Sequence, residues 1–188
     1  MSVTPKKTPS YPWQIKNLNK NTPFPRCDYS LASAKNGAEI WLFGGLGRSG
    51  PRNDLYVIII DSLEAMPMET TPDASFGENG LVPPPRDGHT SVTTVSHLLL
   101  FGGECDDGKC EDSLYAMEIE SKAWHRVPIT GNAPVGRRDH AAVYVNDVMY
   151  IFGGQTDGYF LHDLIAFEVS TCKSMIYPAN LNANSIFS

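Results

Sequence analysis

The side chains with the most chemical potential recur at fixed positions in this chain. Arg86 is followed three residues later by His89, and Arg137 by His140. A third arginine, Arg26, opens a comparable segment. Imidazole is a frequent acid–base group and metal ligand in proteins. Because these pairs return once per repeat, however, we predict that they are hydrogen-bonding structural elements and not catalytic groups.

Cys105 and Cys110 are the next candidates, because they flank four residues and could approach one another across a hairpin. A zinc site would need two more ligands, and no second Cys/His pair of suitable spacing is present. The acidic residues around them lack the spacing of a calcium-binding loop. We therefore predict no metal site and no cofactor. Four cysteines in 188 residues are also too few for a disulfide framework.

An apolar strand closed by a glycine pair occurs three times and defines the repeat. The copies are Trp41-Leu42-Phe43-Gly44-Gly45, Leu99-Leu100-Phe101-Gly102-Gly103 and Tyr150-Ile151-Phe152-Gly153-Gly154. Their first glycines lie 58 and then 51 residues apart, a period typical of stacked supersecondary units. A phosphate-binding loop would need a helix directly after the glycines, and none is predicted. The glycines are expected to allow positive φ and close strand approach.

Each repeat is predicted to form four short strands separated by turns rich in Gly, Pro, Asn and Asp. Related segments open the strand after each glycine pair: Asn53-Asp54-Leu55-Tyr56, Asp112-Ser113-Leu114-Tyr115 and His162-Asp163-Leu164-Ile165. Trp124 marks a fourth strand in the second repeat, and no segment has a sustained helical period. A four-stranded sheet must stack on copies of itself to bury both faces. The predicted fold class is therefore all-β, with antiparallel four-stranded propeller blades.

These motifs resemble the kelch repeat over nearly the whole chain, from Trp13 to about Tyr177. The matching residues are Arg26, Gly44, Gly45, Tyr56, Arg86, His89, Gly102, Gly103, Tyr115, Trp124, Arg137, His140, Gly153 and Gly154. The sequence departs from the family at Tyr29, where histidine is usual, and in having no fourth-strand tryptophan in the first and third repeats. A narrower resemblance, to the kelch domain of fungal cell-end polarity markers, rests on Pro12-Trp13, Pro23-Phe24-Pro25-Arg26 and Asn53-Asp54-Leu55-Tyr56.

The repeats predict the domain organisation. We expect a flexible lead-in over residues 1–10, an outer closing strand over 11–25, and blades over 26–84, 85–135 and 136–188, the third open to being incomplete. Trp13 precedes Arg26 by 13 residues, as Trp124 precedes Arg137, so the closing strand is in register with the end of a repeat. The extra residues of the first repeat, in the stretch 61–82, are expected to enlarge a loop on a blade edge.

The number of blades is the main consequence of the resemblance. It implies a ring of about six or seven blades, in which an N-terminal strand completes the last one. Three glycine-pair strands supply only three blades. We therefore expect an incomplete ring, with the remaining blades in a longer parent chain or lost from a truncated gene model. An open arc would expose apolar blade faces at its ends.

The loops after the glycine pairs are the candidate binding residues, because connections of a meander alternate between its two ends and these loops share one end. They carry Arg48 and Arg52 in the first repeat, Asp106, Asp107 and Lys109 in the second, and Tyr159, Phe160 and His162 in the third. Loops on a rigid scaffold are where binding chemistry concentrates, and a mixed basic, acidic and aromatic surface suits a protein partner. The alternative is that they are ordinary solvated turns.

Composition narrows the choice of partners and compartment. A net charge of −6 and a pI near 5.3 give no support to a nucleic-acid binder. The longest apolar run, residues 55–60, is far shorter than the ~20 residues that span a bilayer. The first ten residues have no apolar core, so they are not a secretory signal. We expect a cytoplasmic protein that does not insert into membranes.

The predicted function is a non-catalytic protein–protein interaction module or scaffold. The narrower resemblance implies polarity or cytoskeletal factors as partners, at the cell cortex or cell ends. Two alternatives remain open. A substrate receptor of a ubiquitin ligase would carry a BTB or similar domain, which these residues do not contain. A kelch-fold oxidase or lyase would need a singular central set of ligands or acid and base groups, whereas the candidates here are the repeated ones.

Overall fold

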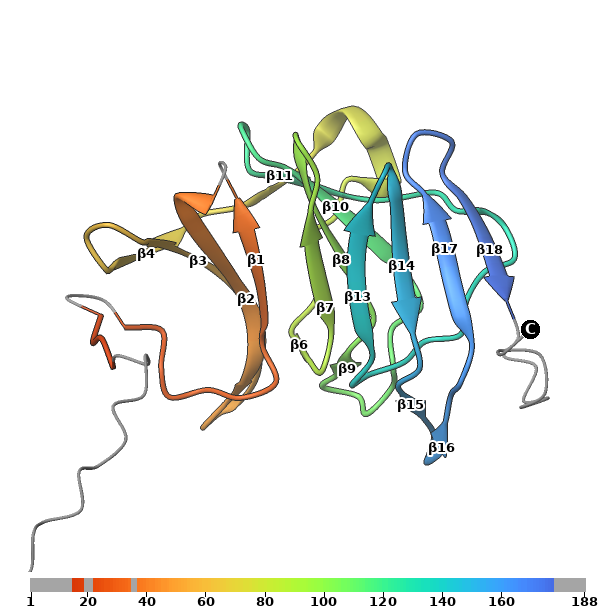
Figure 1. The fold of residues 1–188 in the computed structure, drawn as a ribbon, viewed down its shortest axis with the longest axis horizontal. Helices are drawn as coiled ribbons and strands as arrows, with labels where there is room; N and C mark the ends of the chain where they lie inside the picture. Colours follow the sequence, from red (N-terminus) through yellow and green to blue (C-terminus); the bar gives the residue numbers. More distant parts are fainter. Residues whose placement is uncertain (1–14, 19–21, 35–36, 178–188) are drawn as a thin grey trace, which may run out of the picture.

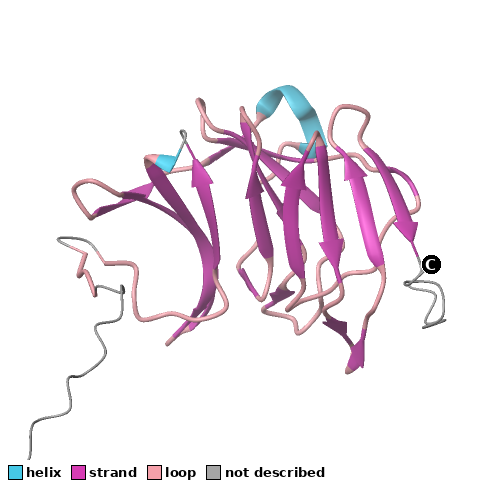
Figure 2. Cartoon of the chain, in the orientation of Figure 1, coloured by secondary structure: helices cyan, strands magenta, loops and turns pink. Residues whose placement is uncertain are grey.

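The computed structural model describes residues 15–18, 22–34 and 37–177, which form three antiparallel meanders standing side by side in chain order (Figures 1 and 2). Blade 1 consists of β1 (Ser30–Ala34), β2 (Glu39–Gly47), β3 (Gly50–Ile59) and β4 (Glu64–Met68). Blade 2 consists of β7 (Thr90–Thr93), β8 (His97–Phe101), β10 (Leu114–Glu118) and β11 (Ala123–Arg126). Blade 3 consists of β13 (Ala141–Val145), β14 (Val148–Phe152), β17 (Leu164–Glu168) and β18 (Lys173–Tyr177). The predicted all-β architecture of four-stranded blades is confirmed.

Short elements complete the fold. They are β5 (Thr71–Pro72), β6 (Arg86–Asp87), β9 (Glu104–Cys105), β12 (Thr130–Gly131), β15 (Gln155–Thr156), β16 (Tyr159–Phe160) and a 3-10 helix, η2 (Ala74–Asn79). Among the described residues no helix is long and apolar enough to cross a membrane.

Turn chemistry and strand composition explain the meanders. Asn146 and Asp147 join β13 to β14 with φ values of 49° and 65°, which a two-residue hairpin turn requires and which these residue types tolerate. Residues 98–101 of the central strand β8 are all buried, because neighbouring sheets cover both faces of blade 2. A strand covered on both sides is a continuous apolar run without alternation.

Two hydrophobic cores lie between the blades. The core between blades 1 and 2 is formed by Ala32, Ala34, Trp41, Phe43, Leu55, Val57, Leu98, Leu100, Tyr115, Met117 and Trp124. The core between blades 2 and 3 is formed by Val92, Leu99, Phe101, Leu114, Ala116, Val127, Met149, Ile151, Ile165 and Phe167. Each sheet therefore buries its apolar faces on its neighbours, as stacked repeats must.

The links between blades also join the sheets. After β4, β5 pairs in parallel with β11, the outer strand of blade 2. After β11, β12 pairs in parallel with β18, the outer strand of blade 3. Each link thus lies along the outer edge of the following blade, where it pairs with edge-strand groups that would otherwise be open to other chains.

The stretch 61–82, expected to be an enlarged loop, is more ordered than that. It contains β4, β5 and η2. Phe76 of η2 stacks on His125 of β11 with ring centroids 3.7 Å apart, and Arg126 Nη2 donates to the Asn79 side chain at 3.1 Å. The insertion therefore covers the outer strand of blade 2.

The predicted N-terminal elements are largely outside the described residues. This applies to the lead-in over 1–10 and to Trp13, on which the closing strand depended. The described residues 15–18 and 22–25 form no strand. The third blade, in contrast, has all four strands although its outer strand contains no tryptophan.

Candidate functional site

The opening arginine of each blade donates a hydrogen bond to the backbone carbonyl of the first glycine in that blade's glycine pair. In blade 3, Nη1 of the fully buried Arg137 donates to the Gly153 carbonyl at 2.9 Å. The same guanidinium contacts both carboxylate oxygens of Asp163, at 2.6 and 2.9 Å, and these bonds hold the pKa of that carboxyl below its usual value. Blade 1 repeats the two-pronged pair between Arg26 and Asp54, at 2.6 and 3.0 Å. A buried guanidinium needs such a partner.

Blade 2 departs from this arrangement. Arg86 Nη1 donates to the Gly102 carbonyl at 2.9 Å, but Ser113 stands where the other blades have the aspartate. Glu111 takes its place from two residues earlier, with Oε2 3.6 Å from Arg86 Nη2. That distance is too long for a hydrogen bond. Among the described residues, Arg86 Nη2 is therefore buried without a hydrogen-bond acceptor.

The histidines connect neighbouring blades. Nε2 of His89 lies 2.9 Å from Ser30 Oγ and 3.2 Å from the Phe43 carbonyl of blade 1. Nε2 of His140 lies 2.7 Å from Thr90 Oγ1 of blade 2. Burial, with the nearby arginine charge, lowers the pKa of His89 to about 3 and that of His140 to about 4. Both rings are therefore neutral at pH 7 and act as structural links, and no hydrogen bond to either Nδ1 is found within the described part of the chain.

The three loops after the glycine pairs lie at one end of the blades, at the bottom of Figure 1. The first is the tight β2–β3 hairpin with Arg48 and Arg52 exposed, and Arg52 Nη1 lies 3.9 Å from Asp54. In the second, Asp107 and Lys109 are exposed and lie 3.6 Å apart. Asp106 of the same loop is also exposed.

The third loop is the β15–β16 hairpin, and it is the most apolar of the three. Tyr159 and Phe160 are 74% and 83% exposed, although both are large aromatic side chains. His162 follows them and is exposed as well. Exposed aromatic pairs are enriched where proteins bind other proteins.

Contacts between blades bring these loops into one surface. A pocket of about 350 Å³ between the first and second loops is lined by Leu46 and Pro51 on one side and by Asp106 on the other. The second loop is tied to blade 3, because Glu104 lies 3.1 Å from Arg138 Nε. We call the surface formed by the loops 46–52, 104–112 and 155–162 the loop face.

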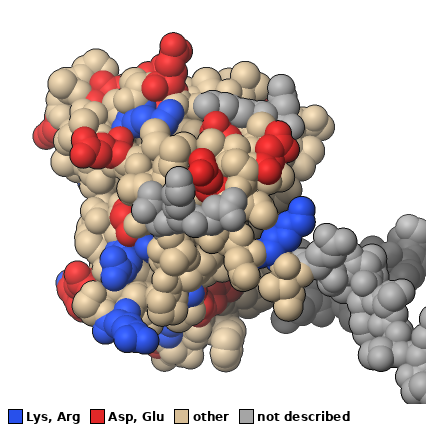
Figure 3. Space-filling model, turned by 90° about the vertical axis from the view of Figure 1, so that its left-hand side faces the viewer, with Lys and Arg blue, Asp and Glu red and all other residues tan. Residues whose placement is uncertain are grey.

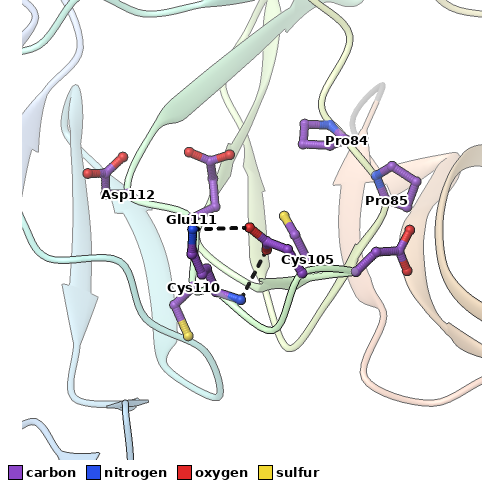
Figure 4. A pocket seen from close by; sticks show the side chains of 9 residues that line it. Pro84, Pro85, Cys105, Cys110, Glu111 and Asp112 are labelled. Atoms are coloured by element: carbon purple, nitrogen blue, oxygen red, sulfur yellow. Dashed lines mark hydrogen bonds and ion pairs between the residues drawn. The ribbon is translucent and has the colours of Figure 1, made fainter.

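The largest concavity of the loop face is a pocket of about 490 Å³ beside the second loop (Figure 4). Its lining residues are Pro84, Pro85, Cys105, Asp106, Asp107, Lys109, Cys110, Glu111 and Asp112. Four carboxylates and one ammonium group give it a negative balance. In Figure 4, the proline link before Arg86 borders one side of the pocket and the second loop forms the remainder.

The two cysteines of this pocket do not face one another. Cys110 pairs with Glu104 across the hairpin, which places Cys105 and Cys110 on opposite sides of the paired backbone. Figure 4 shows their sulfur atoms pointing apart. The expectation that they approach each other is therefore wrong. Burial raises the pKa of both thiols, which keeps them protonated and weakly nucleophilic.

Metal binding finds no support in the described ranges, where no group of three or more His, Cys, Asp or Glu side chains is placed to hold an ion. The side that blade 1 turns outward carries interspersed acidic and basic side chains (Figure 3).

Sequence reasoning predicts an acidic loop that contains Glu104 and Glu111, but it does not predict every contact of the loop face. Pro84, Pro85 and Glu111 line the larger pocket, and the pair of Glu104 and Arg138 fixes the second loop against blade 3. The position of the proline link could be predicted, because successive connections of a meander alternate between the two ends of the blade. The ion pair could not, because its members belong to different repeats.

Comparisons with known proteins agree with the fold. The family model described as KLHDC2/KLHL20/DRC7 Kelch-repeats domain matches residues 30–183. Tip elongation aberrant protein 1 of Schizosaccharomyces pombe is 33% identical over 153 residues, covering 78% of this chain and 13% of that protein. Kelch repeat-containing protein 2 of Saccharomyces cerevisiae is 31% identical, covering 89% and 20%. Host cell factor 1 of Rattus norvegicus is 30% identical, covering 76% and 8%.

These relatives are much longer than the match, so the chain spans at most a fifth of their length. The resemblance inferred from the motifs is confirmed, both for the repeat and for fungal relatives whose names concern tip elongation. The match to the family model extends over most of the chain. The protein belongs to the kelch-repeat family.

Proposed function

We propose that this chain is a non-catalytic protein-interaction module whose loop face binds a protein partner. The observation that carries the proposal is the clustering of three chemically different loops at one end of a rigid scaffold. Tyr159 and Phe160, the most exposed aromatic pair of the loop face, stand as anchors for the partner. The acidic pocket lined by Glu111 supplies a polar contact region on the same loop face.

The side chains capable of chemistry support a binding role over a catalytic one. His89 and His140 are committed to links between blades. Cys105 and Cys110 have raised thiol pKa values and face apart. A catalytic site requires such groups to converge on one reacting centre, with pKa values matched to the reaction.

The cellular role we propose is in organising sites of polarised growth, from the cytoplasm or the cell cortex. Support comes from relatives named Tip elongation aberrant protein 1 and 3 in Schizosaccharomyces pombe. Partners of such a scaffold would be polarity or cytoskeletal proteins. The chain spans only 13% and 12% of these two relatives, so the role concerns this module's contribution to a larger protein.

Partner capture tests the loop face. The chain and its Tyr159→Ala/Phe160→Ala variant are immobilised separately and incubated with a fungal lysate. The variant should lose the specific partners that the wild type captures, because the aromatic pair has been removed. Val95→Ala is the matched control, because Val95 is fully exposed in the turn between β7 and β8, away from the loop face. Equal capture by the double variant and the wild type would contradict the proposal, and enrichment of ubiquitin-ligase subunits would favour a substrate receptor.

A further inference from the structure

The pocket of about 490 Å³ beside the second loop has carboxylates that no basic side chain of its own neutralises. Its one ammonium group, on Lys109, is 84% exposed and lies 3.6 Å from Asp107. Among the described residues, Asp106 and Asp112 form no ion pair. The pocket therefore keeps an excess of negative charge that is open to a cation from outside.

Glu111 is the carboxylate of this pocket that also serves the interior of blade 2 (Figure 4). Its side chain is 21% exposed, and its Oε2 lies 3.6 Å from Nη2 of the fully buried Arg86. Its Oε1 accepts a hydrogen bond from the Ser113 amide at 3.3 Å. Within the described ranges, Oε2 accepts no hydrogen bond. Glu111 is therefore fixed through one oxygen, while the other remains available to a ligand in the pocket.

The buried arginine of blade 2 gives independent evidence that this carboxylate is only partly engaged. Arg86 Nη2 has no hydrogen-bond acceptor in the described part of the chain, although its side chain has no exposed surface and faces Glu111. In the other two blades, Asp54 and Asp163 each accept two hydrogen bonds from the corresponding guanidinium. Ser113 cannot do this, so Arg86 is attracted to Glu111 without bonding to it. A cation in the pocket would compete with Arg86 for that carboxylate.

The negative charge continues on the other side of the second loop. Arg138 is the one basic side chain that lines the pocket of about 350 Å³ between the first and second loops. The carboxylates that line this pocket are those of Asp28, Asp87, Glu104 and Asp106. Burial and the charges of Glu104 and Asp28 raise the pKa of Asp87, as a surplus of carboxylates does. Because Asp106 lines both pockets, the second loop is an acidic ridge between two acidic hollows.

The larger pocket suits a basic side chain better than a metal ion. A hard metal ion needs several oxygen ligands at one point, and no group of three or more candidate ligands converges within the described residues. Lysine and arginine instead pack an aliphatic stem on apolar surface and pair the charged head with carboxylates. Pro84 and Pro85 supply an apolar wall for such a stem.

We propose that the protein partner of the loop face inserts an arginine or lysine side chain into the larger pocket, against the two prolines, and pairs its cation with Glu111. This inference rests on the proposed function, because it names the chemistry of the partner that the loop face binds. Glu111 then has two roles. It stabilises the buried charge of Arg86 in the free protein, and it holds the partner's cation in the complex.

A peptide titration tests the pocket directly. The probe is a blocked glycine–arginine–glycine peptide, and the neutral control is the same peptide with citrulline in place of arginine. Binding is followed in amide NMR spectra of the 188-residue protein. The arginine peptide should shift the amide signals of residues 104–112, and the citrulline peptide should not. Equal shifts with the two peptides, or none in residues 104–112, would overturn the proposal.

Glu111→Gln should weaken binding of the arginine peptide about threefold, because a neutral amide replaces the carboxylate. Glu120→Gln is the matched control. It removes the same charge from an exposed position in the turn between β10 and β11, away from the loop face. Equal weakening by the two variants would show that only the net charge of the protein attracts the peptide, which would also overturn the proposal.

Ser113→Asp separates binding from folding. It gives Arg86 the acceptor that the other two blades have, so Glu111 no longer shares its charge with the blade interior. In this background Glu111→Gln should weaken peptide binding about tenfold, and it should no longer lower the urea midpoint. The same loss of affinity in both backgrounds would show that Arg86 and the ligand do not share Glu111, against the proposal.

Partner capture distinguishes failure of this inference from failure of the proposed function. The expected result is that Glu111→Gln and Tyr159→Ala/Phe160→Ala each reduce capture of the same proteins. Proteins lost with the aromatic variant but retained in full by Glu111→Gln would overturn the inference and leave the proposed function standing. Proteins retained by both variants would overturn the proposed function and the inference together.

Discussion

Ser113 shows how one residue changes a repeated interaction. The first and third blades hold their opening arginine with Asp54 and Asp163, each through two hydrogen bonds. In blade 2 the serine hydroxyl is too short to substitute, and Glu111 reaches only to 3.6 Å from Arg86. The repeat tolerates this because Arg86 still donates to the Gly102 carbonyl and lies over the Tyr115 ring at 4.9 Å.

Ser113→Asp is therefore expected to stabilise the protein. The new carboxylate would accept a hydrogen bond from Arg86 Nη2, a gain of about 0.5–1.5 kcal/mol in the free energy of unfolding. Urea denaturation followed by tryptophan fluorescence measures it. Ser113→Asn is the control, because asparagine has the shape of aspartate without its charge. A Ser113→Asp protein that is no more stable than this control would contradict the claim that Arg86 Nη2 lacks an acceptor.

At the scale of elements, η2 explains why the long first repeat is not simply a longer loop. Asp73 accepts a hydrogen bond from the Ser75 amide at 3.0 Å and so caps the 3-10 helix. Phe76 then stacks on His125 of β11. The sequence revealed the extra length but not this packing, because the contact joins the insertion of one repeat to the outer strand of the next.

Phe76→Ala should release η2 from blade 2 without unfolding the blades. Loss of the stacked ring is expected to cost about 0.5–1.5 kcal/mol locally and to expose residues 73–80 to protease. Limited proteolysis read by mass spectrometry measures the cleavage rate. Phe160→Ala, at a side chain 83% exposed, is the control and should leave that rate unchanged. Equal cleavage of the wild type and Phe76→Ala would show that the stacking does not hold the segment.

The strands themselves were predictable to a large extent. Apolar runs ending in glycine pairs gave the central strands, and turn residues such as Asn146 and Asp147 gave the hairpins. Features that depend on two repeats at once were not predictable from either repeat alone. They include the links that pair with the next blade and the ion pair of Glu104 with Arg138. The opposite orientation of Cys105 and Cys110 was not predictable for another reason, because it depends on Cys110 pairing with Glu104 and not with Cys105.

At the scale of the whole molecule, the two buried histidines make the blade interfaces sensitive to acid. The folded-state pKa values of His89 and His140, about 3 and about 4, lie below the value of about 6.5 in an unfolded chain. The unfolded state therefore binds more protons below that value. The contribution of the two neutral histidines to the free energy of unfolding is complete above about pH 6.5, and it is lost as the pH falls through about 4.

The expected loss between pH 7 and pH 5 is about 2 kcal/mol for each histidine. Urea midpoints across this range measure it. His140→Gln should flatten the pH dependence, since the amide cannot titrate. His162→Gln, at an exposed position on the loop face, is the control. A pH dependence unchanged by His140→Gln would show that acid acts elsewhere.

The parallel strands β5 and β12 have a practical consequence for dissecting this protein. The sequence repeats from arginine to arginine, but the outer edge of the sheet in blades 2 and 3 is paired with residues that belong to the preceding repeat. A fragment that begins at the arginine would leave the backbone groups of its outer edge strand unpaired. Those groups could then pair with other polypeptide chains. Fragments that start at the link, near residue 69 or residue 128, would keep the strand that covers their outer edge. They should be the fragments that stay monomeric.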